Sequence, residues 1–376
     1  MPSDSGASRD TEHIIPEKLE HSVAYRNEDS FCGPIVILTR LPDGELLMLF
    51  REAKWRGHLT HRDPTTRTSL LRSTDNGQSW FSHVTPDPTG GNAVAMTRLD
   101  DGTLLLAAFH WVFADPENRK RLVERPRFKD PGDLNPNFAG RLGLVVASGG
   151  NFLTKSETDG YTWDPMWHLQ EPEGWPDLLV CPPVLELPNG ELLLPATGRR
   201  HPGDKHHALI LRSTDRGRTW ASPTCLTGEV PDDLDFWETR LVLCPSGRLL
   251  AMHRTNGQYW RNISVDGGET WSNAEETAVW CGGSSPPDLT VLSDDRLLLT
   301  RGYRQEPFGV RAHLSTDEGD CWDVDNPIVL RDDGFHFDMG YPCTVELSDG
   351  KLLTAYYWQG EDGIRCIQTA RWALGN

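Results

Sequence analysis

Arginines stand at the ends of several apolar segments in this sequence. Arg51, Arg254 and Arg301 each follow a run of apolar residues that begins shortly after a turn. A glutamate and a tyrosine, Glu238 and Tyr341, stand where two other runs begin. Guanidinium groups bind carboxylates through two parallel hydrogen bonds, so clustered arginines favour an anionic ligand. If the fold brings these ends together, the sequence predicts a pocket for an anion.

The chain itself is strongly acidic. Its 376 residues contain 37 Lys and Arg against 55 Asp and Glu, which gives a formal net charge of −18. A field of that sign repels nucleic acid and anionic lipid, and no apolar run approaches the length of a membrane span. We therefore expect a globular protein with no nucleic-acid partner and no membrane partner, in which an anionic ligand needs a local cluster of arginines.

Neither a metal site nor a cofactor nor an export signal is expected. The eight cysteines are scattered without a CxxC pair, which is typical of reduced thiols. His58, His61, His206 and His207 match no known spacing of metal ligands. The first residues, MPSDSGASRDTEH, lack the basic and apolar segments of a secretory signal, so we expect a cytoplasmic protein.

The elements that must position these residues form a repeat. An apolar segment, a tight turn and a second apolar segment recur six times, and the turns read Pro-Asp-Gly, Asp-Gly, Asn-Gly or similar. Such pairs accept the positive φ of a hairpin turn, so each unit predicts two antiparallel strands. The six predicted hairpins span 35–50, 94–109, 184–197, 240–253, 289–301 and 344–357.

A second pattern, Ser-x-Asp-x-Gly-x-x-Trp, follows most of the hairpins. Ser and Asp can bond the turn backbone, Gly supplies the unusual φ, and Trp packs on the adjoining strands. We therefore assign these aspartates to turn structure. The pattern occurs at 73–80, 213–220, 264–271 and 315–322, and a copy at 156–163 has Thr158 in place of Asp.

Together the patterns predict an all-β, six-bladed β-propeller of four-stranded antiparallel blades. The unit repeats roughly every 50 residues, and radially arranged units of this kind form a propeller. We expect a single domain over 1–376, in which residues around His21–Tyr25 pair with 363–374 and close the last blade. The charged, Pro-rich stretch at about 111–150 reads as a long insertion in blade two, although a seventh blade hidden there is a less economical alternative.

Propeller geometry brings the ends of these strands together at one face of the axis. The first strand of each blade begins near the axis, and the second strand returns to the same face. The arginines at these places therefore converge and predict an anion-binding pocket. They are Arg51, Arg199, Arg200, Arg254, Arg301 and Arg304.

The Ser-x-Asp-x-Gly-x-x-Trp turns resemble the Asp boxes, or BNR repeats, of the sialidase (neuraminidase) superfamily. The segment from Gly340 through Tyr341 to Thr344 resembles the family's segment with the nucleophilic tyrosine, and Glu238 is similar to the glutamate that pairs with it. Arg254 and Arg311 fall where the family has its second and third arginines. The loop that ends at Asp63 resembles the loop with the family's acid.

The resemblance implies an exo-glycoside hydrolase that acts on a terminal acidic sugar. Tyr341 would attack the anomeric carbon, with Glu238 as its base, because a phenol of pKa about 10 is otherwise a poor nucleophile. Asp63 would protonate the leaving group. Arg254 and Arg311 would clamp the substrate carboxylate. Arg51, Arg301 and His61 are expected to complete the contacts with an acidic oligosaccharide or glycoside.

One position departs from the family pattern. The family's first arginine belongs to a Phe-Arg-Ile-Pro-like motif, and this chain has Phe31-Cys32-Gly33-Pro34 there. Arg51, Arg56 or Arg62 could reach the vacant position. The substrate could accordingly be sialic acid, a related ulosonic acid or a uronic acid.

Two other functions remain open from the sequence. In a propeller polysaccharide lyase, Tyr341 or a histidine such as His110 or His253 would abstract a proton next to a carboxylate that an arginine neutralises. In a non-catalytic glycan-binding propeller the same residues would bind without reacting. The sequence makes no prediction of the oligomeric state.

Overall fold

The computed structural model of the chain describes residues 16–57, 62–82, 85–87, 91–118, 143–180, 182–201, 203–228, 230–231 and 233–375. Strands dominate these ranges, and their one helical segment is a 3-10 turn at Pro116–Asn118. The predicted all-β class is confirmed. In the part of the chain that is described, no helix is long and apolar enough to cross a membrane.

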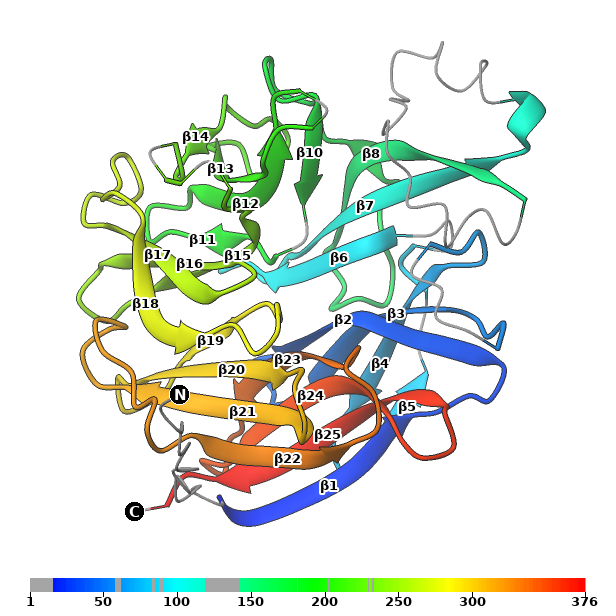
Figure 1. Cartoon of the computed structure of the whole chain (residues 1–376), viewed down its shortest axis with the longest axis vertical. Helices are drawn as coiled ribbons and strands as arrows, with labels where there is room; N and C mark the ends of the chain where they lie inside the picture. The colour runs from blue at the N-terminus through cyan, green and yellow to red at the C-terminus, as the bar shows by residue number, and fades with distance from the viewer. Residues whose placement is uncertain are drawn as a thin grey trace, which may run out of the picture.

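Six antiparallel sheets surround a central axis as the blades of a β-propeller (Figure 1). The predicted blade number and the four-stranded blade are confirmed. Each hairpin provides the two inner strands of a blade, and in blades one to five the turn motif joins the third strand to the fourth. Blade one contains β2 (Ser30–Arg40), β3 (Leu46–Lys54), β4 (Arg67–Ser73) and β5 (Phe81–Ser82). Blade two contains β6 (Gly91–Arg98), β7 (Leu104–Ala114), β8 (Val145–Ser156) and β9 (Trp167–His168).

Blade three has a first strand in two pieces, since β10 (Asp177–Val180) and β11 (Leu185–Glu186) both pair with β12 (Leu192–Arg199). Its outer strands are β13 (His207–Ser213) and β14 (Thr224–Cys225). Blade four contains β15 (Trp237–Leu243), β16 (Leu249–Arg254), β17 (Gln258–Ser264) and β18 (Glu275–Trp280). Blade five contains β19 (Asp288–Val291), β20 (Leu297–Tyr303), β21 (Phe308–Ser315) and β22 (Ile328–Gly334).

Blade six joins the two ends of the described chain. It consists of β23 (Gly340–Glu346), β24 (Leu352–Gln359), β25 (Arg365–Ala373) and β1 (Glu17–Tyr25). β1 runs antiparallel to β25, with His21 opposite Ala370. The predicted closure of the ring is therefore confirmed.

The stretch expected as an insertion is partly strand. β7 continues to Ala114, which pairs with Val145 at the start of β8. Residues 111–114 and 145–150 thus lengthen the antiparallel pair of β7 and β8 instead of forming a loop. The remainder of the expected insertion, 119–142, lies outside the described residues.

The turn motifs hold the outer strands through hydrogen bonds, as predicted. In blade three, Ser213 Oγ accepts from the Gly217 backbone N–H at 2.9 Å, and Asp215 Oδ1 accepts from the Thr219 N–H at 2.8 Å. In blade two, Thr158 replaces the aspartate, and its Oγ1 accepts from the Thr162 N–H at 2.9 Å. A hydroxyl thus keeps the bond that a carboxylate makes in the other copies.

The hydrophobic core lies between neighbouring blades. One cluster packs Val36 and Leu38 of blade one against Leu353 and Ala355 of blade six. Burial on both faces of each sheet fixes the blades against one another. The rigid ring then holds the first-strand ends at one end of the axis.

Candidate active site

Two irregular strand ends aim Glu238 and Tyr341 at the axis. In β15, Trp237 and Thr239 pair with adjacent residues of β16, so Glu238 is an extra residue in a β-bulge. In β23, the register shifts between Gly340 and Cys343, and Tyr341 has a φ of 46°. Bulges redirect side chains next to functional sites, and a positive φ at a bulky residue is strained. The backbone is therefore distorted at both residues of the pair.

Tyr341, Glu238 and Arg254 form one hydrogen-bonded cluster. The Tyr341 hydroxyl donates to Glu238 Oε1 at 2.7 Å. Arg254 Nη1 donates to the tyrosine oxygen at 2.9 Å and to Glu238 Oε2 at 2.8 Å. The structure thus brings together three of the residues that the sequence singled out, from blades six and four.

The charges of this cluster support proton transfer from the phenol to the carboxylate. Burial alone would lower the pKa of Arg254, but the interactions with Glu238 and Tyr341 outweigh it and raise the pKa. Arg254 therefore stays cationic. Its charge lies 2.9 Å from the oxygen on which negative charge develops when Tyr341 gives its proton to Glu238.

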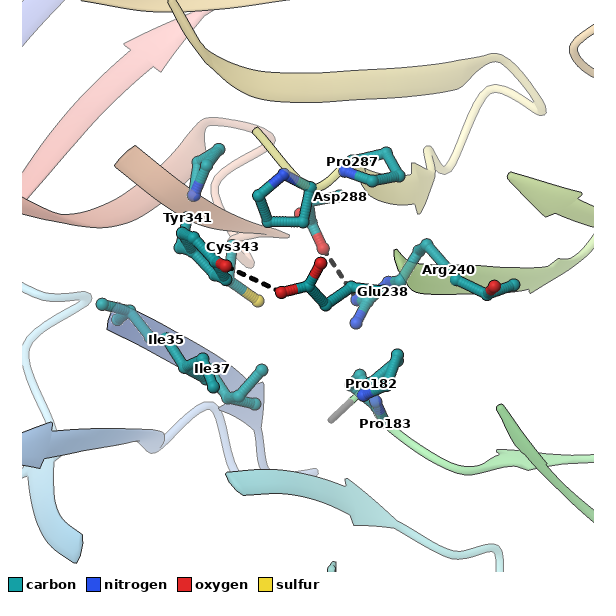
Figure 2. A pocket seen from close by; sticks show the side chains of 14 residues that line it. Ile35, Ile37, Pro182, Pro183, Glu238, Arg240, Pro287, Asp288, Tyr341 and Cys343 are labelled. Carbon is teal, nitrogen blue, oxygen red and sulfur yellow. Dashed lines mark hydrogen bonds and ion pairs between the residues drawn. The ribbon is translucent and has the colours of Figure 1, made fainter. Parts of the chain in front are cut away.

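Below this pair a small cavity lies on the axis. Figure 2 shows Tyr341 and Glu238 lining it, with Ile35 and Ile37 on one side and Pro182 and Pro183 on another. Its volume is about 50 Å³, which suits a few water molecules but not a sugar ring.

A second arginine, Arg304, lies beside Tyr341. Its guanidinium carbon is 5.4 Å from the centre of the Tyr341 ring. Arg304 Nη1 donates to the Ser284 carbonyl at 3.1 Å, and Arg254 Nε donates to Ser284 Oγ at 2.9 Å. Ser284 therefore holds both guanidinium groups close together, and they form the arginine pair of the site.

The sequence placed Arg304 at the axis but assigned the third arginine to Arg311. β20 continues to Tyr303, beyond the apolar run, so Arg304 is the first residue after the strand. A glycine and an aromatic residue stand between the apolar run and Arg304, and they are the sequence signal that could have indicated this longer strand. Arg301 and Arg311, in contrast, face each other on β20 and β21 inside blade five.

Arg301 and Arg311 bond within their own blade. Arg301 Nη2 contacts His313 Nε2 at 3.1 Å, and Arg311 Nη1 donates to the carbonyls of Val310 and Arg331. The guanidinium of Arg311 lies 4.8 Å from the Tyr303 ring centre. The contacts of the described residues connect neither arginine to Tyr341.

Asp63 is buried and tightly bonded. It pairs with Arg56, and Thr65 donates to its Oδ1 through the backbone N–H at 2.8 Å and through Oγ1 at 2.6 Å. Burial favours the neutral acid, but these hydrogen bonds outweigh it and lower the pKa of Asp63. In this arrangement the carboxyl is ionised at neutral pH and has no proton to give. His61, expected beside it, lies outside the described residues.

Arg51 is wholly buried, with no exposed surface. Its Nη1 donates to the Gly33 carbonyl at 2.6 Å and its Nη2 to Thr66 Oγ1 at 3.0 Å. Burial lowers the pKa of Arg51 to about 10, against the opposing effect of Asp63. Arg51 thus ties the start of blade one to the loop that follows Asp63.

The two histidines that the alternative lyase function would use, His253 and His110, bond to other residues. His253 is wholly buried, with Nδ1 at 2.9 Å from Thr239 Oγ1 and Nε2 at 2.6 Å from Asn262 Oδ1. Burial lowers its pKa to about 4, although the bond to Asn262 opposes this. His110 Nε2 lies 2.7 Å from Asp87 Oδ2. His253 is thus engaged inside its blade, and His110 is paired with Asp87, which precedes blade two and bridges Thr68 of blade one.

The described residues contain no group of three His, Cys, Asp or Glu side chains that could hold a metal ion. Seven cysteines fall in this part of the chain, and all are free thiols. Cys32 is fully buried in the core between blades one and six. The residue at the vacant arginine position therefore does not face a substrate.

Comparison with known proteins gives a family and a fold. Residues 134–353 match the BNR repeat-like domain, and no curated protein sequence matches the chain. A Dyadobacter fermentans protein of unknown function is 25% identical, with a TM-score of 0.81 over 95% of this chain and 98% of that chain.

Two more distant structures share the fold. One is the intramolecular trans-sialidase from Ruminococcus gnavus in complex with oseltamivir carboxylate, with 14% identity and a TM-score of 0.64 over 94% of this chain and 97% of that chain. The other is the α-L-arabinanase of Penicillium chrysogenum, with 14% identity and a TM-score of 0.62 over 93% and 97%. Their different names indicate that the fold alone does not fix an activity.

Proposed function

Because this chain belongs to the BNR repeat-like domain family and joins Tyr341, Glu238 and Arg254 in one cluster, we propose that it is an exo-acting glycoside hydrolase of the sialidase type. The observation that carries the proposal is the 2.7 Å hydrogen bond from the Tyr341 hydroxyl to Glu238. A phenol that donates to a carboxylate beside a guanidinium is a tyrosine prepared to act as a nucleophile.

The proposed reaction has two steps. Glu238 takes the phenol proton as Tyr341 oxygen forms a bond to the anomeric carbon, and the glycosidic bond breaks. The leaving oxygen takes a proton from an acid. Water then attacks the anomeric carbon and gives a proton to the conjugate base of that acid, the bond to the tyrosine oxygen breaks, Tyr341 regains its proton from Glu238, and the free sugar departs.

An acidic sugar fits this site for two electrostatic reasons. Arg254 and Arg304 place two cations around Ser284, close to Tyr341, in a chain of net charge −18. A neutral phenol approaches a carboxylate-bearing sugar without the charge repulsion that an anionic Asp or Glu nucleophile would meet. We propose a terminal sialic, related ulosonic or uronic acid as substrate, without a metal or cofactor.

The proton for the leaving group comes from Asp63 in this proposal, and the pair between Arg56 and Asp63 must open first. While the pair is closed, the lowered pKa keeps the carboxyl ionised. Opening would leave a buried carboxyl that favours its protonated form. The trans-sialidase that shares the fold is bound to a carboxylate ligand by name, which agrees with an acidic substrate.

The test is aglycone release from aryl glycosides of sialic, other ulosonic and uronic acids by the wild type and by Tyr341→Phe. We expect release from one sugar class and a loss of about 10²-fold to 10⁴-fold in the variant. An ultraviolet-absorbing unsaturated product without hydrolysis would instead identify a lyase. Binding of the sugars without any turnover would identify a glycan-binding propeller.

A further inference from the structure

Tyr357, on β24, connects the arginine pair to a buried carboxylate. Its hydroxyl donates to Asp338 Oδ1 at 2.6 Å and accepts a hydrogen bond from Arg304 Nη2 at 3.1 Å. The ring lies 6.0 Å from the Tyr341 ring, centre to centre. It also fills the space beside Gly33, where an added Cβ would come within 2.6 Å of the Tyr357 ring. Tyr357 is therefore fixed on all sides next to the nucleophile.

Asp338 sets the direction of the hydroxyl. Its other oxygen, Oδ2, accepts from Arg365 Nη1 at 2.7 Å, and both side chains are almost fully buried. A phenol has one hydrogen, so donation to Asp338 turns the oxygen lone pairs toward Arg304. Burial raises the pKa of Tyr357, which keeps that hydrogen in place at neutral pH.

The consequence is a fully oriented guanidinium. Nε of Arg304 donates to the Met339 carbonyl at 3.1 Å, Nη1 donates to Ser284, and Nη2 donates to Tyr357. Each terminal nitrogen carries two hydrogens and uses one of them in these bonds. The second hydrogen of each nitrogen is then left to donate to a ligand, and a carboxylate is the group that accepts two such hydrogen bonds from one guanidinium.

We propose that Tyr357 and Asp338 are positioning residues that hold Arg304 for the substrate carboxylate and so set the preference of the site for acidic over neutral sugars. The inference rests on the proposed function, because it names the residues behind the specificity of the same site. Neither residue touches the substrate. Each acts through Arg304.

The adjacent tyrosine provides a matched control. Tyr356 is as deeply buried as Tyr357, but its side chain lies on the other face of β24, with its hydroxyl 3.3 Å from His21 Nδ1. Tyr357→Phe removes the acceptor of Arg304, whereas Tyr356→Phe removes a buried hydroxyl that is remote from it. Asp338→Asn, of nearly equal volume, tests the same connection from its other end.

The assay compares the aryl glycoside that the wild type hydrolyses with its carboxamide. For Tyr357→Phe we expect KM for the acid to rise about tenfold, equivalent to about 1.4 kcal/mol, with kcat nearly unchanged and the carboxamide unaffected. Asp338→Asn should reduce the preference for the acid in the same way, and Tyr356→Phe should keep it. Equal losses on the acid and the carboxamide, or an unchanged preference in Tyr357→Phe, would overturn the proposal.

A crystal structure of Tyr357→Phe tests the inference without turnover. We expect Arg304 to leave its place over the Tyr341 ring, while Arg254 and Glu238 remain paired. If Arg304 keeps its position, the inference fails, whatever the enzyme hydrolyses. If Arg304 moves but no acidic glycoside is cleaved by the wild type, the proposed function fails and the positioning role stands.

Discussion

Tyr341 and Glu238 lie 103 residues apart in the chain, and the hydroxyl of the first donates to the carboxylate of the second across 2.7 Å. They begin the first strands of blades six and four, so the bond passes in front of blade five. The segment that leads from blade four into blade five contributes Ser284, which accepts from Arg254 Nε. The pair thus forms only when blades four and six are both in place, and its geometry depends on the ring that holds them.

Replacement of Glu238 by glutamine separates hydrogen bonding from proton transfer. The amide oxygen can still accept from Tyr341, but it is a far weaker base than the carboxylate. We expect kcat for aryl glycosides to fall by about 10²-fold to 10⁴-fold. Glu276→Gln, an exposed glutamate of the same blade, is the control and should keep its kcat. An active Glu238→Gln enzyme would remove the base from the mechanism.

Most of the fold was predictable because its signals are local. The hairpin turns, the alternating strands and the turn motifs each depend on a few neighbouring residues and recur in most blades. The repeat also required a partner for the strand at 363–374, which pointed to the N-terminal segment around His21. A closed ring leaves no other edge for it to pair with.

The site was less predictable because it depends on irregular backbone and on strand length. Arg301 lies within β20, so alternation sends it into the blade, and Arg304, just beyond the strand, reaches Tyr341. No distinctive residue in the sequence indicates the bulge at Glu238. Only Gly340, with a φ of 104°, marks the distortion that precedes Tyr341.

Asp63→Asn should make activity depend on the leaving group. A phenolate leaves readily without a proton, whereas an alkoxide does not, so an acid matters only for the second. We expect little loss on aryl glycosides and a loss of about 10²-fold or more on alkyl or sugar glycosides of the same acid. Asp43→Asn, in the exposed first hairpin turn, is the control. Equal losses on both aglycones would assign Asp63 to structure.

Restoring arginine at position 32 should destabilise the fold. Cys32 is fully buried, and the cations of Arg51 and Arg365 act on its thiol. Glu52 lies opposite Cys32 in the strand register. Its carboxylate already accepts hydrogen bonds from Tyr25, Arg67 and Ser69. A third guanidinium would therefore lie among buried cations without a free partner.

We expect Cys32→Arg to lower the free energy of unfolding by about 3–5 kcal/mol. Cys32→Met adds a long side chain without charge, and overpacking alone should cost about 1–3 kcal/mol. Urea unfolding of the three proteins measures the difference. An arginine variant as stable as the methionine variant would mean that the position can accept the cation.

His253 should make the stability of the propeller fall in mild acid. Burial lowers its folded-state pKa to about 4, below the ordinary value of 6.5, so the unfolded chain binds a proton in this interval and the folded chain does not. The free energy of unfolding therefore rises with pH between about 4 and 6.5, by up to about 1.4 kcal/mol per pH unit for this group. Above pH 7 the contribution is constant.

His253→Gln keeps polar atoms near Thr239 and Asn262 but does not titrate. Urea unfolding between pH 7.5 and 4.5 should show a variant that is less stable than the wild type at pH 7.5 and approaches it as the pH falls. His313, whose pKa burial also lowers to about 4, leaves part of the slope in the variant. His201→Gln, at an exposed position, should reproduce the wild-type slope. Parallel curves for wild type and His253→Gln would show that His253 accepts its proton in the folded state as readily as in the unfolded chain.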